Sequence, residues 1–134
     1  MPGIRFNNHF QDILVDRYAW ISGIIGGQTG THILSGQYGA ILGGVSNVVS
    51  GRQCIVCGGN GNTAKGFAAM VGAGATNQTT GDWSFIGAGK SNLIDGVTSA
   101  IAAGNTNTVN SINSFIGAGG TNVIFKDPAG VGDN

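Results

Sequence analysis

The chain has 134 residues, 26 of them glycine, with six basic and six acidic side chains that leave no net charge. This length predicts one structural unit, and a charged content of only 9% gives no electrostatic basis for binding nucleic acid or an anionic membrane. No apolar run is long enough for insertion into a bilayer, and the glycines lack the triplet spacing of collagen.

The first 23 residues lie outside the periodic pattern that follows, and they hold the large aromatic side chains Phe6, Phe10, Tyr18 and Trp20. Two interpretations stay open for residues 1–23: a cap over the first turn of the repeat, or a segment that attaches the protein to a capsid or tail protein. One segment could serve both roles in an oligomer. Because it lacks the basic-then-apolar layout of a secretory signal, we expect assembly in the cytoplasm of a host cell.

Residues 24–124 repeat with a period of fifteen. Asparagine recurs at Asn47, Asn62, Asn77, Asn92, Asn107 and Asn122. Glycine keeps the same step from Gly44 to Gly119, and a third column is aliphatic at Ile41, Val56, Val71, Ile86, Ile101 and Ile116. A period this strict is typical of stacked copies of one small unit. The sequence therefore predicts an all-β fold, a parallel β-helix or β-roll solenoid with 15-residue rungs.

Each rung contains two candidate strands. Along residues 84–88 one face reads small, aliphatic, small, which suits the inside of a narrow coil. The second strand contributes the inner column Val49, Ala64, Thr79, Ile94, Val109 and Ile124. Asparagine and glycine then mark the corners, because both tolerate left-handed backbone conformations. We also expect the stacked asparagine side chains to hydrogen-bond along the rod as a ladder.

The outer face of the first strand carries an apolar column: Ala40, Ile55, Met70, Phe85, Ala100 and Phe115. A single coil would leave this stripe in water, and long exposed apolar stripes usually mark an interface. We expect three copies to bury it around one axis, as a homotrimer of roughly triangular coils. Two alternatives stay open: the stripe faces another protein, or the strand is shifted by one residue and the stripe points inward.

The first turn of the repeat is irregular. Residues 24–27 align with residues 41–44, but the segment that begins at His32 aligns with the one that begins at Asn47. Two extra residues therefore lie within residues 28–31, which we interpret as a widened loop. His32 takes the place of a ladder asparagine, and a metal role for it is a minor alternative.

The last turn is irregular as well. Ser111 and Lys126 interrupt a corner column that is otherwise glycine, at Gly36, Gly51, Gly66, Gly81 and Gly96. Residues 125–134 are rich in turn residues, and Pro128 cannot extend a ladder. This segment is expected to be a terminator, an exposed tip or a linker.

The repeat Ser-x-Ile-Gly-x-Gly-x-x-Asn, which begins at Ser84 and again at Ser114, resembles the shaft repeats of phage tail fibres and virion spikes. It is also similar to the head repeats of YadA-type trimeric autotransporter adhesins. The resemblance covers about residues 22–124 and implies a trimeric left-handed parallel β-roll or β-helix. The rung is longer than is usual in the adhesins, and no stalk heptads or membrane anchor follow. A small virion component is therefore the better match.

Residues typical of metal or redox sites are few. Cys54 and Cys57 lie three residues apart, which in a strand places their sulfurs on opposite faces and disfavours a disulfide. With His9 and His32 as the only histidines, a four-ligand zinc site is not expected. We interpret both cysteines as small apolar residues and expect neither a metal nor another cofactor.

Catalysis is not expected either. Asp82 and Asp95 could approach across a corner, as a glycosidase carboxylate pair would require. No cleft or neighbouring base supports them, and Trp83 is the one side chain that could stack on a sugar.

The leading hypothesis is a structural virion protein, either a short trimeric spike, a head fibre or a decoration protein, attached by residues 1–23 and located in the virion. The alternative is an adhesin module that binds a receptor or a host-surface glycan through its corner loops or its C-terminal tip. Ice binding is a minor third hypothesis. The candidate ice-binding column consists of Ser46, Gly61, Thr76, Ser91, Thr106 and Thr121, and no second threonine column runs parallel to it.

Overall fold

The structure is a computed structural model that describes residues 31–126 and, as backbone alone, residues 24 and 25. The proposed attachment residues Phe6, Phe10, Tyr18 and Trp20 and the terminal segment after Lys126 lie outside the described residues.

The described residues form two seven-stranded parallel sheets with no helix. The odd sheet contains β1 (Ile24–Ile25), β3 (Ala40–Ile41), β5 (Ile55–Val56), β7 (Met70–Val71), β9 (Phe85–Ile86), β11 (Ala100–Ile101) and β13 (Phe115–Ile116). The even sheet contains β2 (Ile33–Leu34), β4 (Val48–Val49), β6 (Thr63–Ala64), β8 (Gln78–Thr79), β10 (Leu93–Ile94), β12 (Thr108–Val109) and β14 (Val123–Ile124).

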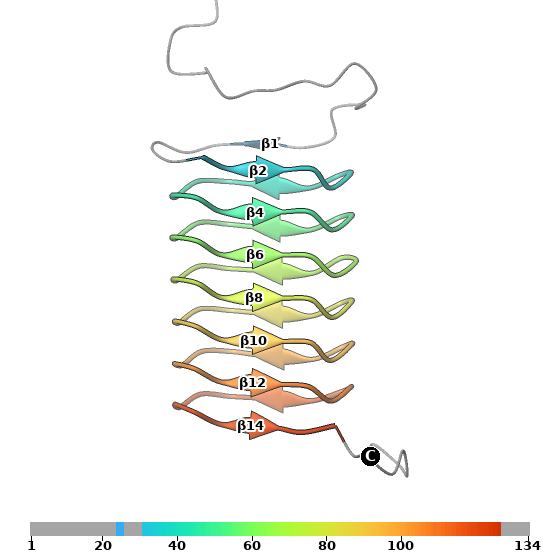
Figure 1. Cartoon of the computed structure of the whole chain (residues 1–134), viewed down its shortest axis with the longest axis vertical. Coiled ribbons are helices and arrows are strands. Elements are labelled where there is room, and N and C mark those ends of the chain that lie inside the picture. Colours follow the sequence, from blue (N-terminus) through green and yellow to red (C-terminus); the bar gives the residue numbers. More distant parts are fainter. Residues whose placement is uncertain (1–23, 26–30, 127–134) are drawn as a thin grey trace, which may run out of the picture.

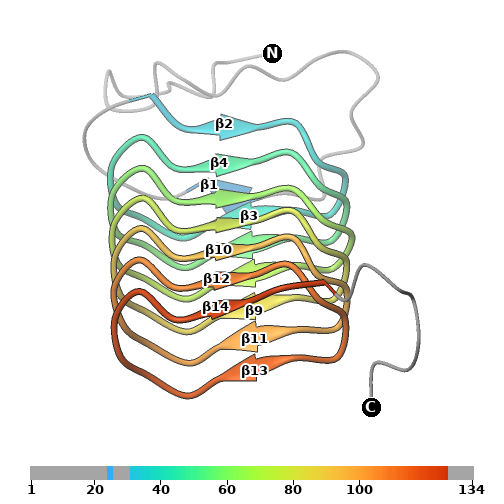
Figure 2. The same ribbon diagram turned by 60° about the horizontal axis from the view of Figure 1, so that its bottom comes forward.

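The chain alternates between the two sheets, so each rung contributes one strand to each. In Figure 1 it runs left to right through the even sheet in front and returns through the odd sheet behind as it descends, which makes the coil left-handed. Figure 2 shows the two sheets facing each other across a narrow interior. The predicted parallel solenoid is confirmed. Its outline is two-sheeted rather than triangular, because the third side is only a row of isolated bridges that begins with Val45 and Asn60.

Successive strands pair fifteen residues apart, as in Ala40 with Ile55 and Val48 with Thr63. The first pair differs, because Ile24 lies opposite Ala40 and Ile25 opposite Ile41. That offset is sixteen residues, so the first turn contains one extra residue and the prediction of two was wrong. The count of two came from aligning the Gly-Gly pairs in residues 24–27 and 41–44. In the structure, the register follows the backbone pairing of β1 with β3 instead.

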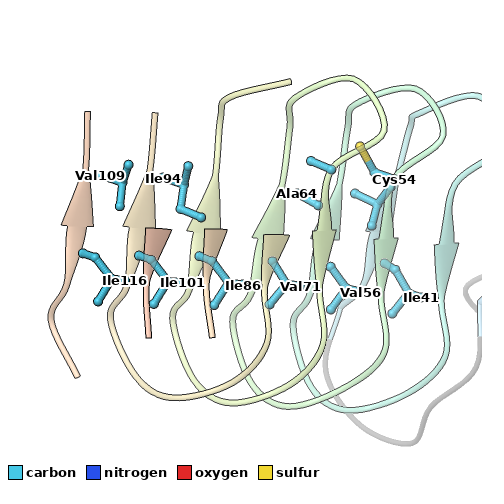
Figure 3. Close-up of a cluster of buried hydrophobic side chains, with 12 residues drawn as sticks. Ile41, Cys54, Val56, Ala64, Val71, Ile86, Ile94, Ile101, Val109 and Ile116 are labelled. Atoms are coloured by element: carbon cyan, nitrogen blue, oxygen red, sulfur yellow. The ribbon is translucent and has the colours of Figure 1, made fainter. Parts of the chain in front are cut away.

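The core is one column from each sheet (Figure 3). The odd sheet contributes Ile41, Val56, Val71, Ile86, Ile101 and Ile116, and the even sheet contributes Val49, Ala64, Ile94 and Val109 beside Thr79. All of them are buried, which confirms the predicted strand parity and excludes the shift by one residue. The prediction that the second small residue of the small-aliphatic-small face points inward was wrong, because Ala73, Ala88 and Ala118 are exposed. Each strand has only two residues, and the chain turns away from the core after them.

The ladder asparagines from Asn47 to Asn107 lie inside the coil, whereas Asn122 in the last rung is exposed. The Nδ2 of Asn77 donates to the carbonyls of Ala73 (3.1 Å) and Gly89 (2.9 Å), and its Oδ1 accepts the backbone N–H of Asn92 at 3.0 Å. The same bonds recur from rung to rung, and from Asn92 onward the Nδ2 also donates to the previous asparagine. The predicted ladder is confirmed. Its role is to satisfy turn carbonyls and N–H groups that the narrow core would otherwise leave unpaired.

The asparagines do not adopt the left-handed backbone expected of them. Positive φ occurs instead in the column from Gly44 to Gly119, in the column from Ser46 to Thr121, and in a third column: Tyr38, Gln53, Ala68, Trp83, Thr98 and Asn113. The corner glycines that begin at Gly36 are required by lack of space rather than by positive φ. A Cβ on Gly36, Gly66 or Gly81 would collide with the carbonyl of the next glycine in the column.

Replacing Asn77 with alanine should lower the free energy of unfolding by about 2–4 kcal/mol, because the turn carbonyls and the N–H of Asn92 lose their buried partner. Asn60→Ala is the matched control, since Asn60 is exposed, and its effect should stay within about 0.5 kcal/mol. Denaturant unfolding measures both, and equal effects would contradict the ladder's structural role.

Thr79→Val should raise the free energy of unfolding by about 1–2 kcal/mol, because the Thr79 hydroxyl is buried with no hydrogen-bond partner in the described part of the chain. The control is Thr63→Val on the outer side of β6, where a change within about 0.5 kcal/mol is expected. A loss of stability in the Thr79 variant would show that its hydroxyl is bonded.

Candidate functional surfaces

The outward side of the odd sheet, here called the odd face, is apolar along its length. It consists of Ala40, Ile55, Met70, Phe85, Ala100 and Phe115, and all six are exposed or partly exposed. Phe115 is 65% exposed and Phe85 40%. The structure therefore brings the predicted interface residues together on one surface.

The two phenylalanine rings lie along the odd face rather than standing away from it. The Cε1 of Phe85 would be 3.5 Å from a Cβ on Gly87, and the Cε1 of Phe115 would be 3.7 Å from one on Gly117. Each ring thus covers the glycine two residues further along its rung. Leu42 and Cys57 occupy the equivalent flanking position in earlier rungs, and Leu42 is also exposed. The result is an apolar surface of low relief that runs along the rod.

The odd face carries no charge within the described residues. Charged side chains in that part of the chain are Arg52, Lys65, Asp82, Lys90, Asp95 and Lys126, and none belongs to an odd strand or its flanking positions. The outward column of the even sheet is mixed, because Thr63, Gln78 and Thr108 alternate with the apolar Ile33, Val48, Leu93 and Val123. Asp95 beside it accepts a hydrogen bond from the Thr80 hydroxyl at 2.7 Å. The odd face differs in that its column contains no polar side chain.

One narrow edge of the coil carries small hydroxyl residues in the column that begins at Ser46. The hydroxyls of Thr76 and Thr121 donate to the carbonyl of the preceding residue at 2.7 Å, and Thr76 Oγ1 lies 3.0 Å from Ser91 Oγ. Thr106 donates its hydroxyl to the side chain of Asn105 at 3.0 Å, so the three threonine hydroxyls of this column are each bonded to a neighbouring group. The neighbouring outward column of the even sheet is mixed, with Leu93 and Val123 among its members.

The opposite edge, here called the aromatic edge, consists of Tyr38, Arg52, Gln53, Phe67, Asp82 and Trp83. The rings of Phe67 and Trp83 meet edge-to-face, with centroids 5.4 Å apart and an angle of 77° between planes. The Arg52 guanidinium lies 5.6 Å from the centre of the Tyr38 ring. These pairs join residues sixteen and fourteen apart, one step off the repeat period, so column-by-column comparison missed them.

The two aspartates singled out from the sequence have separate partners. Asp82 Oδ1 accepts the backbone N–H of Phe67 at 2.7 Å, whereas Asp95 is bonded to Thr80. Each carboxylate is thus held by a group fifteen residues away in the neighbouring rung.

Both cysteines are free. Cys54 is buried, and its Sγ donates to the Gly66 carbonyl at 2.6 Å. Burial raises the pKa of the Cys54 thiol above its ordinary value, which makes it a poor nucleophile. Cys57 is partly exposed beside the odd face.

His32 takes the structural place of a ladder asparagine, because its Nδ1 accepts the backbone N–H of Asn47 at 3.2 Å. Within the described residues, no three histidine, cysteine or acidic side chains gather as a metal site would require.

No family model matches the chain, and no curated protein or solved structure matches it. Over the residues that the structure describes, there is no helix with the length and apolar character needed to cross a membrane.

Proposed function

We propose that the chain is a structural virion protein, a short spike, head fibre or decoration protein that assembles as a homotrimer. The observation that carries this proposal is the odd face, an uncharged apolar surface along the whole described rod. Large exposed apolar patches on soluble proteins mark association sites. The narrow interior adds a second reason, because it holds one column of core side chains from each sheet, so burial of the odd face would add apolar contact to a small core.

The occupant of the odd face is a second and a third copy of the chain. Six rungs about 4.8 Å apart and five residues wide make a face of about 30 by 16 Å. Pairing two such faces buries about 1,000 Å² in total, near the lower bound for a specific interface. Without charges on the face, identical copies do not repel one another there.

A parallel arrangement about an axis along the rod suits an attached shaft, because it gathers the N-terminal segments of all copies at one end. Phe6, Phe10, Tyr18 and Trp20 would then meet a capsid or tail protein together. A cyclic trimer places the phenylalanines of the odd face at the axis. The flat side of a two-sheeted coil can also pair with one other copy about a two-fold axis. The number of copies is therefore decided by the molar mass of the assembly.

Cys57 reports on assembly, because it lies beside Ile55 on the odd face. In a Cys54→Ser background it is the one thiol of the chain. We expect slow labelling of Cys57 in the assembled protein and labelling about tenfold faster or more in the Phe85→Asp variant, since an unpaired carboxylate is costly in an apolar interface.

Thr108→Asp is the matched control for this experiment, because it places the same charge on the outer side of the even sheet. Cys57 should stay protected in that variant. Equally fast labelling with and without Phe85→Asp would mean that the odd face is already in water.

Attachment to a particle is tested separately. An antibody against residues 31–126 should mark purified virus particles from the source culture, and a chain that lacks residues 1–20 should assemble normally but fail to join them. Attachment that survives the deletion would move the proposed contact away from the N-terminal segment. Absence of the protein from every particle would contradict the virion assignment.

A further inference from the structure

The aromatic edge carries large residues where the backbone disfavours them. Tyr38 has a φ of 58° and Trp83 a φ of 49°, in a region where bulky side chains are rare and glycine or asparagine is relaxed. Burial does not offset that cost, because Tyr38 is 51% exposed and Trp83 58%. The coil could fold with small residues at these positions, as Ala68 does in the same column. The fold does not require aromatic side chains at these two positions, so what Tyr38 and Trp83 add is the exposed surface of their rings.

Both rings are held in place by neighbours from adjacent rungs. Trp83 packs edge-to-face against Phe67, and Tyr38 lies under the Arg52 guanidinium. Rings that are fixed before binding lose little conformational freedom when a ligand arrives. The edge therefore has the preorganisation of a binding surface.

Polar groups accompany the rings. Asp82 precedes Trp83, and its Oδ1 accepts the Phe67 N–H, which fixes the carboxylate. The other carboxylate oxygen has no partner in the described structure, and the Gln53 side chain is exposed on the same edge. Aromatic faces beside fixed carboxylate, guanidinium and amide groups suit a ligand that has both apolar faces and hydroxyl groups.

The arrangement of these groups is linear. Tyr38 and Trp83 occupy the same position of rungs three apart, about 14 Å along the rod at the usual strand spacing. Between them lie Gln53 and the small Ala68. We infer that the aromatic edge binds a linear carbohydrate along the rod, with sugar rings on Tyr38 and Trp83 and hydroxyl groups on the polar side chains between them. This role goes beyond the proposed shaft function.

Two other ligand classes fit the edge less well. Single-stranded nucleic acid also stacks on aromatic rings, but it needs a positively charged groove, and among the described residues Arg52 is the one cation of the aromatic edge. A protein partner would draw on tyrosine, tryptophan and arginine gathered in one central patch. Here the two exposed rings are separated along the axis of the rod, which suits a narrow and extended ligand.

The test is binding of the full chain to a panel of immobilised neutral and acidic oligosaccharides. We expect saturable binding to at least one linear oligosaccharide and much weaker binding to its monosaccharide. Trp83→Asn and Tyr38→Asn should each weaken binding about tenfold, because each removes one stacking ring. Asparagine is chosen because it accepts positive φ, so the variants should keep a thermal midpoint close to that of the parent.

Thr106→Ala on the opposite edge is the control and should bind like the parent chain. Binding to none of the oligosaccharides, or binding that survives the double variant of Tyr38 and Trp83, would overturn the inference. A change of solution mass in the double variant would also overturn it, because the edge would then be a contact between copies. Loss of carbohydrate binding at unchanged mass supports the inference whether or not the chain joins a virion.

Discussion

The register between successive rungs is the constraint on which the rest of the structure depends. Two-residue strands are too short to define a sheet by themselves, so each must find its partner fifteen residues away. The buried asparagine enforces that distance, because its side chain bonds both to its own turn and to the next rung. A slip of one residue would place the asparagine outside and leave turn carbonyls unpaired in the interior.

Once the register is fixed, the interior positions accept few residue types. Ile86 and its column neighbours face one way, the asparagines fill the corners, and Gly81 must remain glycine because a side chain would strike the next rung. Chemical variety is therefore confined to outward positions such as Phe85 and Trp83. Stacking repeats those positions at every rung, so the available surfaces are long and narrow. Such surfaces suit copies of the same rod or extended ligands better than compact substrates.

The periodic sequence was enough to predict the rung, the inward position of Ile86, the outward position of Phe85 and the ladder. Each of these depends on residues that recur at one spacing. It did not predict that Ala88 is exposed, because two-residue strands end before alternation can be judged from sequence. Positive φ at Trp83 was also missed, since the column has no shared residue type. The aromatic edge depends on contacts between different columns, which a search within columns cannot detect.

The central claim is that the odd face is an interface between copies of this chain. Its most direct test is the molar mass of the untagged protein, measured by light scattering on a sizing column over a wide range of concentration. The account predicts the mass of three chains, unchanged on dilution, and a stable dimer would keep the interface but replace the three-fold axis. A stable, folded monomer would contradict the claim, because Phe85 and Phe115 would then remain in water.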